Sequence, residues 1–239
     1  VAKLKNVGIH LKLASILVGD DPAGRLYVSL KKKRAEAIGI EMDVYYLKEK
    51  ESLEDILILI KTLDLDPTVH GIMVQLPLPL IIKHQTLTII NSIRSEKDVD
   101  GLRENSSFVH PTAMAILQVI EEARLRLASA RQAKTICVIG KSGMVGSALL
   151  KTIKDTKYKL VEKPEEADIL VSATGVPNII KKEMVKKGAI VIDVGSPQGD
   201  CDPEVSEIAG FLTPVPRGIG PVTISCLLEN LVKASSAIV

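Results

Sequence analysis

The chain has 239 residues, enough for one large domain or two of ordinary size. Hydrophobic residues make up 46% of it, yet there is no Trp and there are only 2 Phe, so Ile, Leu, Val and Ala supply most of the apolar volume. That mixture is typical of parallel sheets buried on both faces. The net charge of +2 is too small to indicate nucleic-acid binding, and no apolar run reaches the ~20 residues of a membrane span.

The cysteines and histidines indicate neither a metal site nor a disulfide framework. The 3 Cys are widely spaced, and the 4 His form no cluster with metal-ligand spacing. We therefore expect reduced thiols, no bound metal and a cytoplasmic location, since no signal peptide is visible either.

The first part of the chain alternates predicted strands and helices, which indicates a parallel sheet with right-handed crossovers. The first helix is expected to begin at Asp20-Asp21-Pro22, an N-cap followed by Pro, and to end at Gly39. The second begins with the capping box Ser52-Leu-Glu-Asp55. In chain order the predicted strands are 13–18, 42–47 and 71–75, and the helices are 20–39, 52–63 and 84–93.

A second α/β run follows a long helix predicted over 112–127. Its predicted strands are 135–139, 158–161, 168–173 and 189–194, with a helix from a glycine turn to about residue 153 and a last helix over 223–234. No strand follows the last helix, so we expect it to pack back on the first domain and make that domain discontinuous. The predicted division is 1–111 plus 222–239 for the first domain, and 112–221 for a Rossmann-like domain.

The glycine turn lies between the predicted strand 135–139 and the following helix. Gly140, Gly143 and Gly146 would let backbone N–H groups and the helix N-terminus approach a pyrophosphate closely. The spacing is not G-x-G-x-x-G, and tight packing without a ligand is the alternative. The strand before it and the strands after it favour a cofactor site.

Tyr27 and Lys31 are one turn apart on the first helix and share a face. We expect Leu26, Leu30 and Ala37 to form the buried stripe, with Tyr27 and Lys31 at its border. A lysine there could simply extend its ammonium to water. If it is desolvated instead, its lowered pKa suits it to proton transfer near neutral pH.

Three polar residues lie at the end of a predicted strand or in a predicted loop of the first domain. Gln75 ends a strand, and Pro77 and Pro79 stop further pairing, so its amide is expected at the carboxyl edge, where parallel sheets bind ligands. A Gln that only caps backbone groups is the alternative. Asp98 and Asp100 could form a plain turn, or one carboxylate could accept two N–H bonds from an amino-pyrimidine edge.

With these residues and motifs, the chain resembles the bifunctional methylenetetrahydrofolate dehydrogenase/cyclohydrolases. The matching segments run over essentially the whole chain in the family's order. They are Val18–Ala23 with Tyr27 and Lys31, Gly71–Pro79, Lys97–Gly101, Val138–Ser142 with Val145 and Gly146, Ala167–Val171, Gly188–Gly195, Gly199 and Asp200, and Thr213–Thr223.

The resemblance implies an α/β fold of two domains, an N-terminal parallel-sheet catalytic domain and a C-terminal Rossmann-like dinucleotide-binding domain, in a homodimer. It implies that Lys31 and Gln75 are catalytic, with Tyr27 as the ring stacked on folate, and that tetrahydrofolate derivatives are the partners. The implied substrate-binding residues are Tyr27, Asp100, Pro216, Gly220 and Pro221. The implied cofactor-binding residues are Gly140, Lys141, Ser142, Val145, Gly146, Thr174, Gly175 and Thr223.

The chain departs from the family's pattern at several positions. Gly24 replaces Ser, Lys141 replaces Arg, Arg217 replaces Gly, and His110-Pro-Thr-Ala113 stands where Pro-Cys-Thr-Pro is usual. Glu162-Lys163-Pro164-Glu165 replaces a His-Ser pair near the cofactor's ribose. Lys141 and Lys163 would attract the 2′-phosphate of NADP, whereas an acid such as Glu162 commonly binds the ribose hydroxyls of NAD. We expect NADP, with NAD as the alternative.

The reaction implied is oxidation of 5,10-methylenetetrahydrofolate to the 5,10-methenyl cation, followed by hydrolysis to 10-formyltetrahydrofolate. One alternative is a dehydrogenase that lacks the hydrolytic step, which the altered positions at His110 and Arg217 leave open. Another is a non-enzymatic nucleotide-sensing module, which would leave Lys31, Gln75 and Asp100 unexplained.

Overall fold

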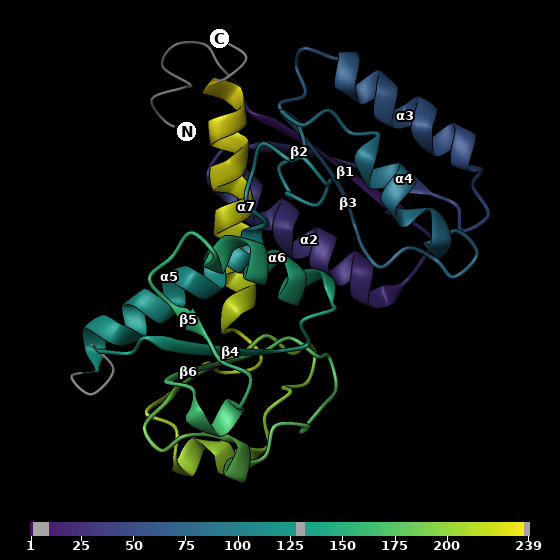
Figure 1. Cartoon of the computed structure of the whole chain (residues 1–239). Helices are drawn as coiled ribbons and strands as arrows, with labels where there is room; N and C mark the ends of the chain where they lie inside the picture. The colour runs from purple at the N-terminus through teal and green to yellow at the C-terminus, as the bar shows by residue number, and fades with distance from the viewer. Residues whose placement is uncertain (2–9, 128–131, 237–239) are drawn as a thin grey trace. The chain divides into compact units, whose positions relative to one another are not determined.

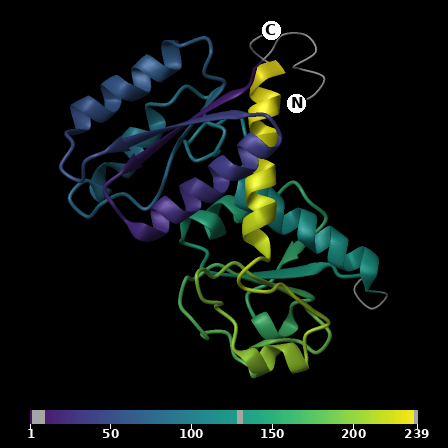
Figure 2. The same cartoon turned by 180° about the vertical axis from the view of Figure 1, so that it is seen from behind.

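Two parallel sheets organise the chain, one in each of two units (Figures 1 and 2). The computed structural model describes residue 1, residues 10–127 and residues 132–236. The first unit comprises Val1–Val109 and Leu227–Val239, and the second comprises His110–Cys226. These limits lie a few residues from the division expected after residue 111 and before residue 222.

The first unit contains a three-stranded sheet whose strands are all parallel, in the order β2-β1-β3. Its elements are β1 (Lys12–Val18), α2 (Pro22–Ala37), β2 (Glu41–Leu47), α3 (Leu53–Leu65), β3 (Gly71–Val74), a 3₁₀ turn (Lys83–Gln85) and α4 (Thr86–Asn91). The second half of α7 (Ile219–Ser236) also belongs to this unit. The predicted α/β order is confirmed, although the last predicted helix of this part is divided between the 3₁₀ turn and α4.

The starts of α2 and α3 follow from side chains that cap their free N–H groups. The Asp21 carboxylate accepts a hydrogen bond from Gly24 N at 2.7 Å, and Ser52 Oγ accepts one from Asp55 N at 3.1 Å. Each cap contributes about 1 kcal/mol. Both predicted helix starts are confirmed.

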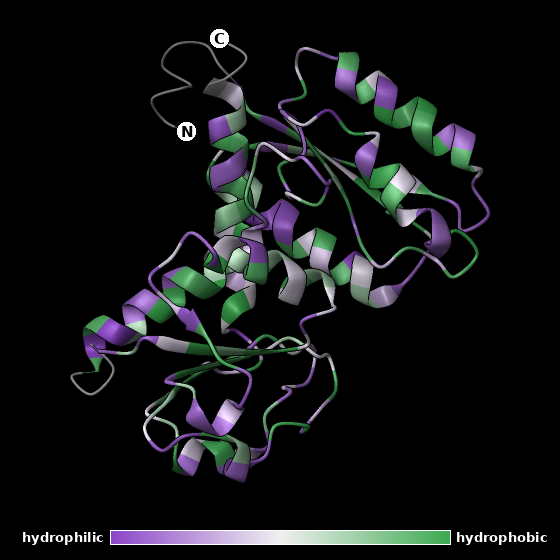
Figure 3. Ribbon diagram, viewed as in Figure 1, coloured by the Kyte–Doolittle hydropathy of each residue, from purple (hydrophilic) through white to green (hydrophobic). Residues whose placement is uncertain are grey.

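The core of the first unit lies between the sheet and helices α3 and α4. Alternate residues of β1, Ala14, Ile16 and Val18, pack with Ile56 and Ile60 of α3 in one buried cluster. Hydrophobic and hydrophilic residues alternate around α3, as a one-sided helix requires (Figure 3). The other face of the sheet is therefore left for α2.

The buried stripe expected on α2 is wrong. Leu26 and Leu30 are exposed, at 57% and 42%, and Ala37 is exposed as well. The buried residues are instead Gly24, Val28 and Ala35, which are small or β-branched. A Cβ at Gly24 would lie 3.2 Å from Leu17 Cδ1 of β1, so α2 lies close to the sheet on its small residues. Its large leucines consequently lie outside the contact.

The second unit contains a five-stranded parallel sheet in the order β5-β4-β6-β7-β8. Its elements are α5 (Pro111–Arg126), β4 (Thr135–Ile139), α6 (Met144–Ile153), β5 (Lys159–Leu160), β6 (Ile169–Ser172), β7 (Ile190–Asp193), β8 (Phe211–Leu212) and the first half of α7, with 3₁₀ turns at Pro164–Glu166, Lys182–Met184 and Pro203–Glu207. The sequence did not predict β8, because two paired residues carry no periodicity. It also placed the start of α7 too late.

The three central strands of this sheet, β4, β6 and β7, are buried on both faces. Ile136 and Val138 of β4 pack in the cluster that holds α5 and α6, whereas Cys137 packs in a second cluster with the 3₁₀ segments. This alternation follows from the two-residue period of a strand. It explains the nearly continuous apolar runs from which the strands were predicted.

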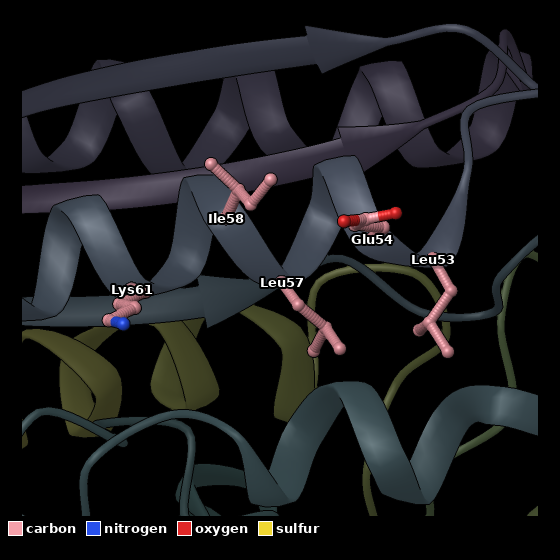
Figure 4. A pocket seen from close by; sticks show the side chains of 5 residues that line it. All are labelled: Leu53, Glu54, Leu57, Ile58 and Lys61. Carbon is pink, nitrogen blue, oxygen red and sulfur yellow. The ribbon is translucent and has the colours of Figure 1, made fainter.

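Two further observations concern surfaces. None of the helices in the described ranges is long and apolar enough to span a membrane. A pocket on α3 is lined by residues of that helix alone, namely Leu53, Glu54, Leu57, Ile58 and Lys61 (Figure 4). None of the residues predicted to be functional lines it, so the candidate site lies elsewhere.

Candidate active site

Lys31 and Gln75 are in direct contact in the first unit. Lys31 Nζ of α2 donates a hydrogen bond to Gln75 Oε1 at 3.0 Å. Gln75 directly follows β3, is buried, and its N–H donates to Ile16 O at 2.8 Å, which extends the pairing of β3 with β1. Its Nε2 donates to Leu76 O at 2.8 Å, so the amide oxygen is held toward Lys31. The two residues that sequence placed on separate elements form one polar pair.

The environment of Lys31 favours the neutral amine more strongly than the environment of a surface lysine does. Burial lowers the pKa of Lys31 below its usual value, and the negative charge of Asp100 opposes this more weakly. The bonded partner of Nζ is a neutral amide, which does not hold the ammonium as a carboxylate would. Lys31 therefore has the character of a proton-transfer group.

Tyr27 lies one turn before Lys31 on α2 and is partly buried. Residues so spaced share a helix face, so the ring and the ammonium are neighbours. This provides a flat apolar surface beside the polar pair.

The two acidic residues of the segment 97–101 have different environments. Asp98 is buried, pairs with Ile72 in an isolated bridge and accepts a hydrogen bond from Arg103 N at 3.0 Å. Burial raises the pKa of Asp98 to about 6. Asp100 is only partly buried and accepts no hydrogen bond from the described residues. Asp98 therefore holds the loop, and the Asp100 carboxylate is the one available to a ligand.

Two buried residues that sequence reasoning missed fix the loop that carries Asp100. Lys97 Nζ donates to the carbonyl oxygens of Leu63, Asp64 and Asp66 at 3.1, 2.8 and 2.7 Å, where α3 ends. From α7, Asn230 Nδ2 donates to Val99 O and Val109 O, each at 2.9 Å. The Lys-Asp-Val-Asp run was the signal in the sequence that could have identified Lys97. Asn230 lies far along the chain from Val99 and Val109, so the sequence gives no signal of its contacts.

The glycine turn of the second unit fits a dinucleotide phosphate group. Gly140 has φ +88°, and a Cβ there would lie 2.4 Å from Ala173 O. A Cβ on Gly146 would lie 2.1 Å from Gly140 O. Only glycine permits this close turn before α6. No side chain caps the first turn of α6, so its N–H groups can meet a pyrophosphate.

Both lysines that sequence reasoning offered to the 2′-phosphate have a carboxylate partner. Lys141 Nζ lies 2.5 Å from Glu162 Oε2, and Lys163 Nζ lies 2.9 Å from Glu166 Oε1. In the first pair Lys141 is 33% exposed and Glu162 is 78% exposed. Glu162 follows β5, where an acid that binds ribose hydroxyls is expected. The two residues with opposite cofactor preferences thus form one ion pair.

The other predicted ligand residues of the second unit lie around the same sheet. Ser142 and Val145 belong to the glycine turn and the start of α6, and Thr174 and Gly175 follow β6. Pro216 lies in the loop between β8 and α7, and Gly220, Pro221 and Thr223 lie in the first turns of α7.

Arg217, in the loop between β8 and α7, has φ +77°, a conformation that favours glycine.

No group of three or more His, Cys, Asp or Glu side chains within the described ranges is arranged to hold a metal ion.

Both halves of the chain match one protein family. "Tetrahydrofolate dehydrogenase/cyclohydrolase, catalytic domain" matches residues 1–100, and the family's "NAD(P)-binding domain" matches residues 110–238. The "Bifunctional protein FolD" of Listeria innocua is 39% identical over 265 residues, which cover 100% of this chain and 91% of that protein.

Solved structures agree over the same extent. The FolD methylenetetrahydrofolate dehydrogenase/cyclohydrolase of Campylobacter jejuni has a TM-score of 0.90 and 35% identity, covering 100% of this chain and 92% of that one. The N5,N10-methylenetetrahydrofolate dehydrogenase-cyclohydrolase of Trypanosoma brucei, complexed with NADP cofactor and inhibitor, has a TM-score of 0.85 and 29% identity, covering 99% and 91%.

Proposed function

This chain belongs to the tetrahydrofolate dehydrogenase/cyclohydrolase family, and from that premise we propose that it oxidises 5,10-methylenetetrahydrofolate to 5,10-methenyltetrahydrofolate and then hydrolyses this product to 10-formyltetrahydrofolate. The observation that carries the hydrolytic half is the hydrogen bond of Lys31 to Gln75. The test is a spectrophotometric assay with methylenetetrahydrofolate and each nicotinamide cofactor, followed by a separate assay of methenyl hydrolysis.

The oxidation depends on a nicotinamide cofactor in the second unit. When bound, the nicotinamide ring supplies the hydride acceptor for the methylene carbon of the folate. The turn from Gly140 to Gly146 with the start of α6 would hold its pyrophosphate, and Thr174 and Gly175 would line the adjoining edge of the sheet. The protein contributes alignment and the exclusion of water from this step.

In the hydrolysis, Lys31 acts as the proton-transfer group. As water adds to the methenyl carbon, neutral Lys31 takes a proton from it. The hydroxyl of the resulting carbinolamine then loses its proton to solvent as its oxygen becomes the formyl carbonyl and the bond from carbon to N5 breaks, and N5 takes back the proton that Lys31 holds, so that one proton is released overall. Gln75 holds the Lys31 amine in position through its amide oxygen. Tyr27 stacks on the folate ring system, and Asp100 accepts two N–H bonds from the amino-pyrimidine edge. From the family resemblance we propose that Pro216, Gly220 and Pro221 also bind the substrate.

This role of Lys31 predicts a pH dependence. Because the neutral amine is the active form, the rate of methenyl hydrolysis should rise with pH, reach half of its maximum at the pKa of Lys31 and level off above it, and burial lowers that pKa below the usual value of a lysine. Asp100 raises that pKa, so Asp100→Asn should lower it and move the rise to lower pH. The measurement is kcat against pH for both proteins at saturating substrate. A profile that stays in place or moves upward in the variant would contradict the assignment.

We propose NADP as the preferred cofactor. The Lys141 ammonium lies in the glycine turn itself, where it can contact a 2′-phosphate. A phosphate carries more negative charge than the Glu162 carboxylate and can displace it, since that carboxylate is largely exposed and loosely held. The NADP bound to the Trypanosoma brucei relative supports this preference. Glu162 of this ion pair nevertheless reduces the preference for NADP, because its carboxylate repels the 2′-phosphate.

Two variants with opposite expected effects test the cofactor preference. Lys141→Ala should remove most of the advantage of NADP over NAD in kcat/KM, whereas Glu162→Gln should increase that advantage by about 5-fold or more, as loss of a nearby like charge implies. Lys187→Ala is the matched control, because Lys187 is an exposed lysine of the second unit that has no part in the proposed cofactor site. A wild-type enzyme that prefers NAD would refute the proposal.

A dehydrogenase without hydrolytic activity is the remaining alternative, and the separate hydrolysis assay decides it. The homodimer and the cytoplasmic location are proposals from family resemblance, and light scattering of the purified protein would test the first. We also propose that the first unit binds folate and the second binds the cofactor, in accord with the two matched family domains.

A further inference from the structure

Two buried carboxylates lie beneath the carboxyl edge of the second sheet, and neither has a part in the chemistry proposed above. Asp193 and Asp200 are 3% and 0% exposed. Asp193, at the end of β7, accepts hydrogen bonds from Gly195 N, Asp200 N and Cys201 N at 2.8, 3.0 and 2.8 Å. These bonds fold the loop 195–201 back on the sheet and bring Asp200 to the neighbouring strand.

Asp200 holds the segment that follows β6. Its Oδ2 accepts hydrogen bonds from Ser172 Oγ at 2.7 Å, from Thr174 N at 2.7 Å and from Thr174 Oγ1 at 2.8 Å. The backbone continues the contact, since Ile180 N donates to Asp200 O at 2.9 Å. One carboxylate oxygen thus fixes both the end of β6 and the first residue after Ala173.

The segment that Asp200 fixes also supports the glycine turn. A Cβ on Gly140 would lie 2.4 Å from Ala173 O, so the turn and residue 173 are in close contact. Ser172 and Thr174, which flank Ala173 in the sequence, both donate hydrogen bonds to Asp200. The position of Ala173 is therefore set on both sides.

The other oxygen of Asp200 has no partner. Its Oδ1 is buried and accepts no hydrogen bond from any described residue, and no cation pairs with the carboxylate within those ranges. Burying an oxygen without a hydrogen bond opposes folding, so this carboxyl group stabilises the fold less than a fully bonded one would.

The strand order indicates which part of the cofactor this segment meets. The order reverses between β4 and β6, and a dinucleotide binds across that point. The acid that faces the adenosine ribose follows β5, on one side, and the segment held by Asp200 follows β6, on the other. Resting on the proposed function, we infer that Asp200 is a positioning residue that sets the affinity of the protein for the nicotinamide half of its cofactor.

The experiment compares a whole cofactor with its adenosine half in Asp200→Asn. The wild type is first titrated with NADP⁺ and NAD⁺, and the tighter one is used together with its fragment, 2′,5′-ADP or ADP. The Kd of the whole cofactor should rise about 10-fold in the variant, and that of the fragment should stay within about twofold. Methenyl hydrolysis, which needs no cofactor, should stay at the wild-type rate, and thermal unfolding reports whether the variant folds.

Equal weakening of cofactor and fragment would show a general defect of the second unit and overturn the inference, as would an unchanged cofactor Kd. If Asp200→Asn does not fold, Ser172→Ala decides, because it removes one donor to Asp200 and should raise the cofactor Kd about 2- to 3-fold without affecting the fragment. Failure of the wild type to bind either cofactor would refute the proposed function instead.

Discussion

Replacement of Lys31 by methionine is expected to abolish methenyl hydrolysis. The side chain keeps roughly its length and loses the amine that is bonded to Gln75 Oε1. General acid–base catalysis by one positioned group contributes roughly 10²-fold to 10⁴-fold, so the rate should fall by about 10²-fold or more. The measurement is the initial rate of methenyl disappearance, corrected for the uncatalysed reaction at the same pH.

Two further variants separate proton transfer from charge and from general damage to α2. Lys31→Arg keeps a positive charge but cannot release its proton near neutral pH, so it should be as inactive as Lys31→Met. Lys33→Met is the matched control, because Lys33 lies exposed on the same helix and should leave the rate unchanged. Hydrolysis near the wild-type rate in Lys31→Met would refute the assignment, and activity retained in Lys31→Arg would make the role electrostatic.

Replacement of Asp100 by alanine is expected to weaken folate binding in both reactions. The carboxylate accepts no hydrogen bond from the described residues, so its removal leaves no donor of the loop unpaired. A folate donor edge that loses its acceptor costs about 1–3 kcal/mol, which corresponds to roughly 5-fold to 150-fold in Kd. The measurement is the Kd of folate by titration, with KM of both activities beside it.

The design must separate binding from the effect of Asp100 on Lys31. Since Asp100 raises the pKa of Lys31, hydrolysis by the variant is compared at the pH where each profile is level. Asp100→Asn keeps one acceptor oxygen and should fall between wild type and Asp100→Ala. Unchanged folate affinity in Asp100→Ala would contradict the role.

Much of the local structure followed from the sequence because its causes are local. Asp21 and Ser52 satisfy N–H groups only three residues away, so the starts of α2 and α3 could be predicted. The strand Thr135–Ile139 and the glycine turn after it were visible as an apolar run and its punctuation. The candidate residues Lys31, Gln75 and Asp100 were identified because each is a polar residue where packing alone does not require one.

The buried face of α2, by contrast, could not be predicted from the sequence. Leu26 and Leu30 are apolar and correctly spaced, yet they are exposed, because α2 contacts β1 through Gly24 and Val28. Which face of α2 is buried depends on how closely its backbone approaches that of β1, and the spacing of hydrophobic residues along the sequence does not specify that distance. β8 was missed for a related reason, since its two residues form a strand only by pairing with β7.

The sequence alone thus determined the class of fold, the family resemblance and the candidate reactive side chains, because these depend on periodicity, capping and residue chemistry. Tertiary structure decided which of them meet. It joined Lys31 to Gln75, assigned Asp98 to the loop and left Asp100 available, and paired Lys141 with Glu162. It also buried Asp200 against Thr174, a contact with no local signal. Hydrogen bonds and desolvation act over a few ångströms in space, whatever the separation along the chain.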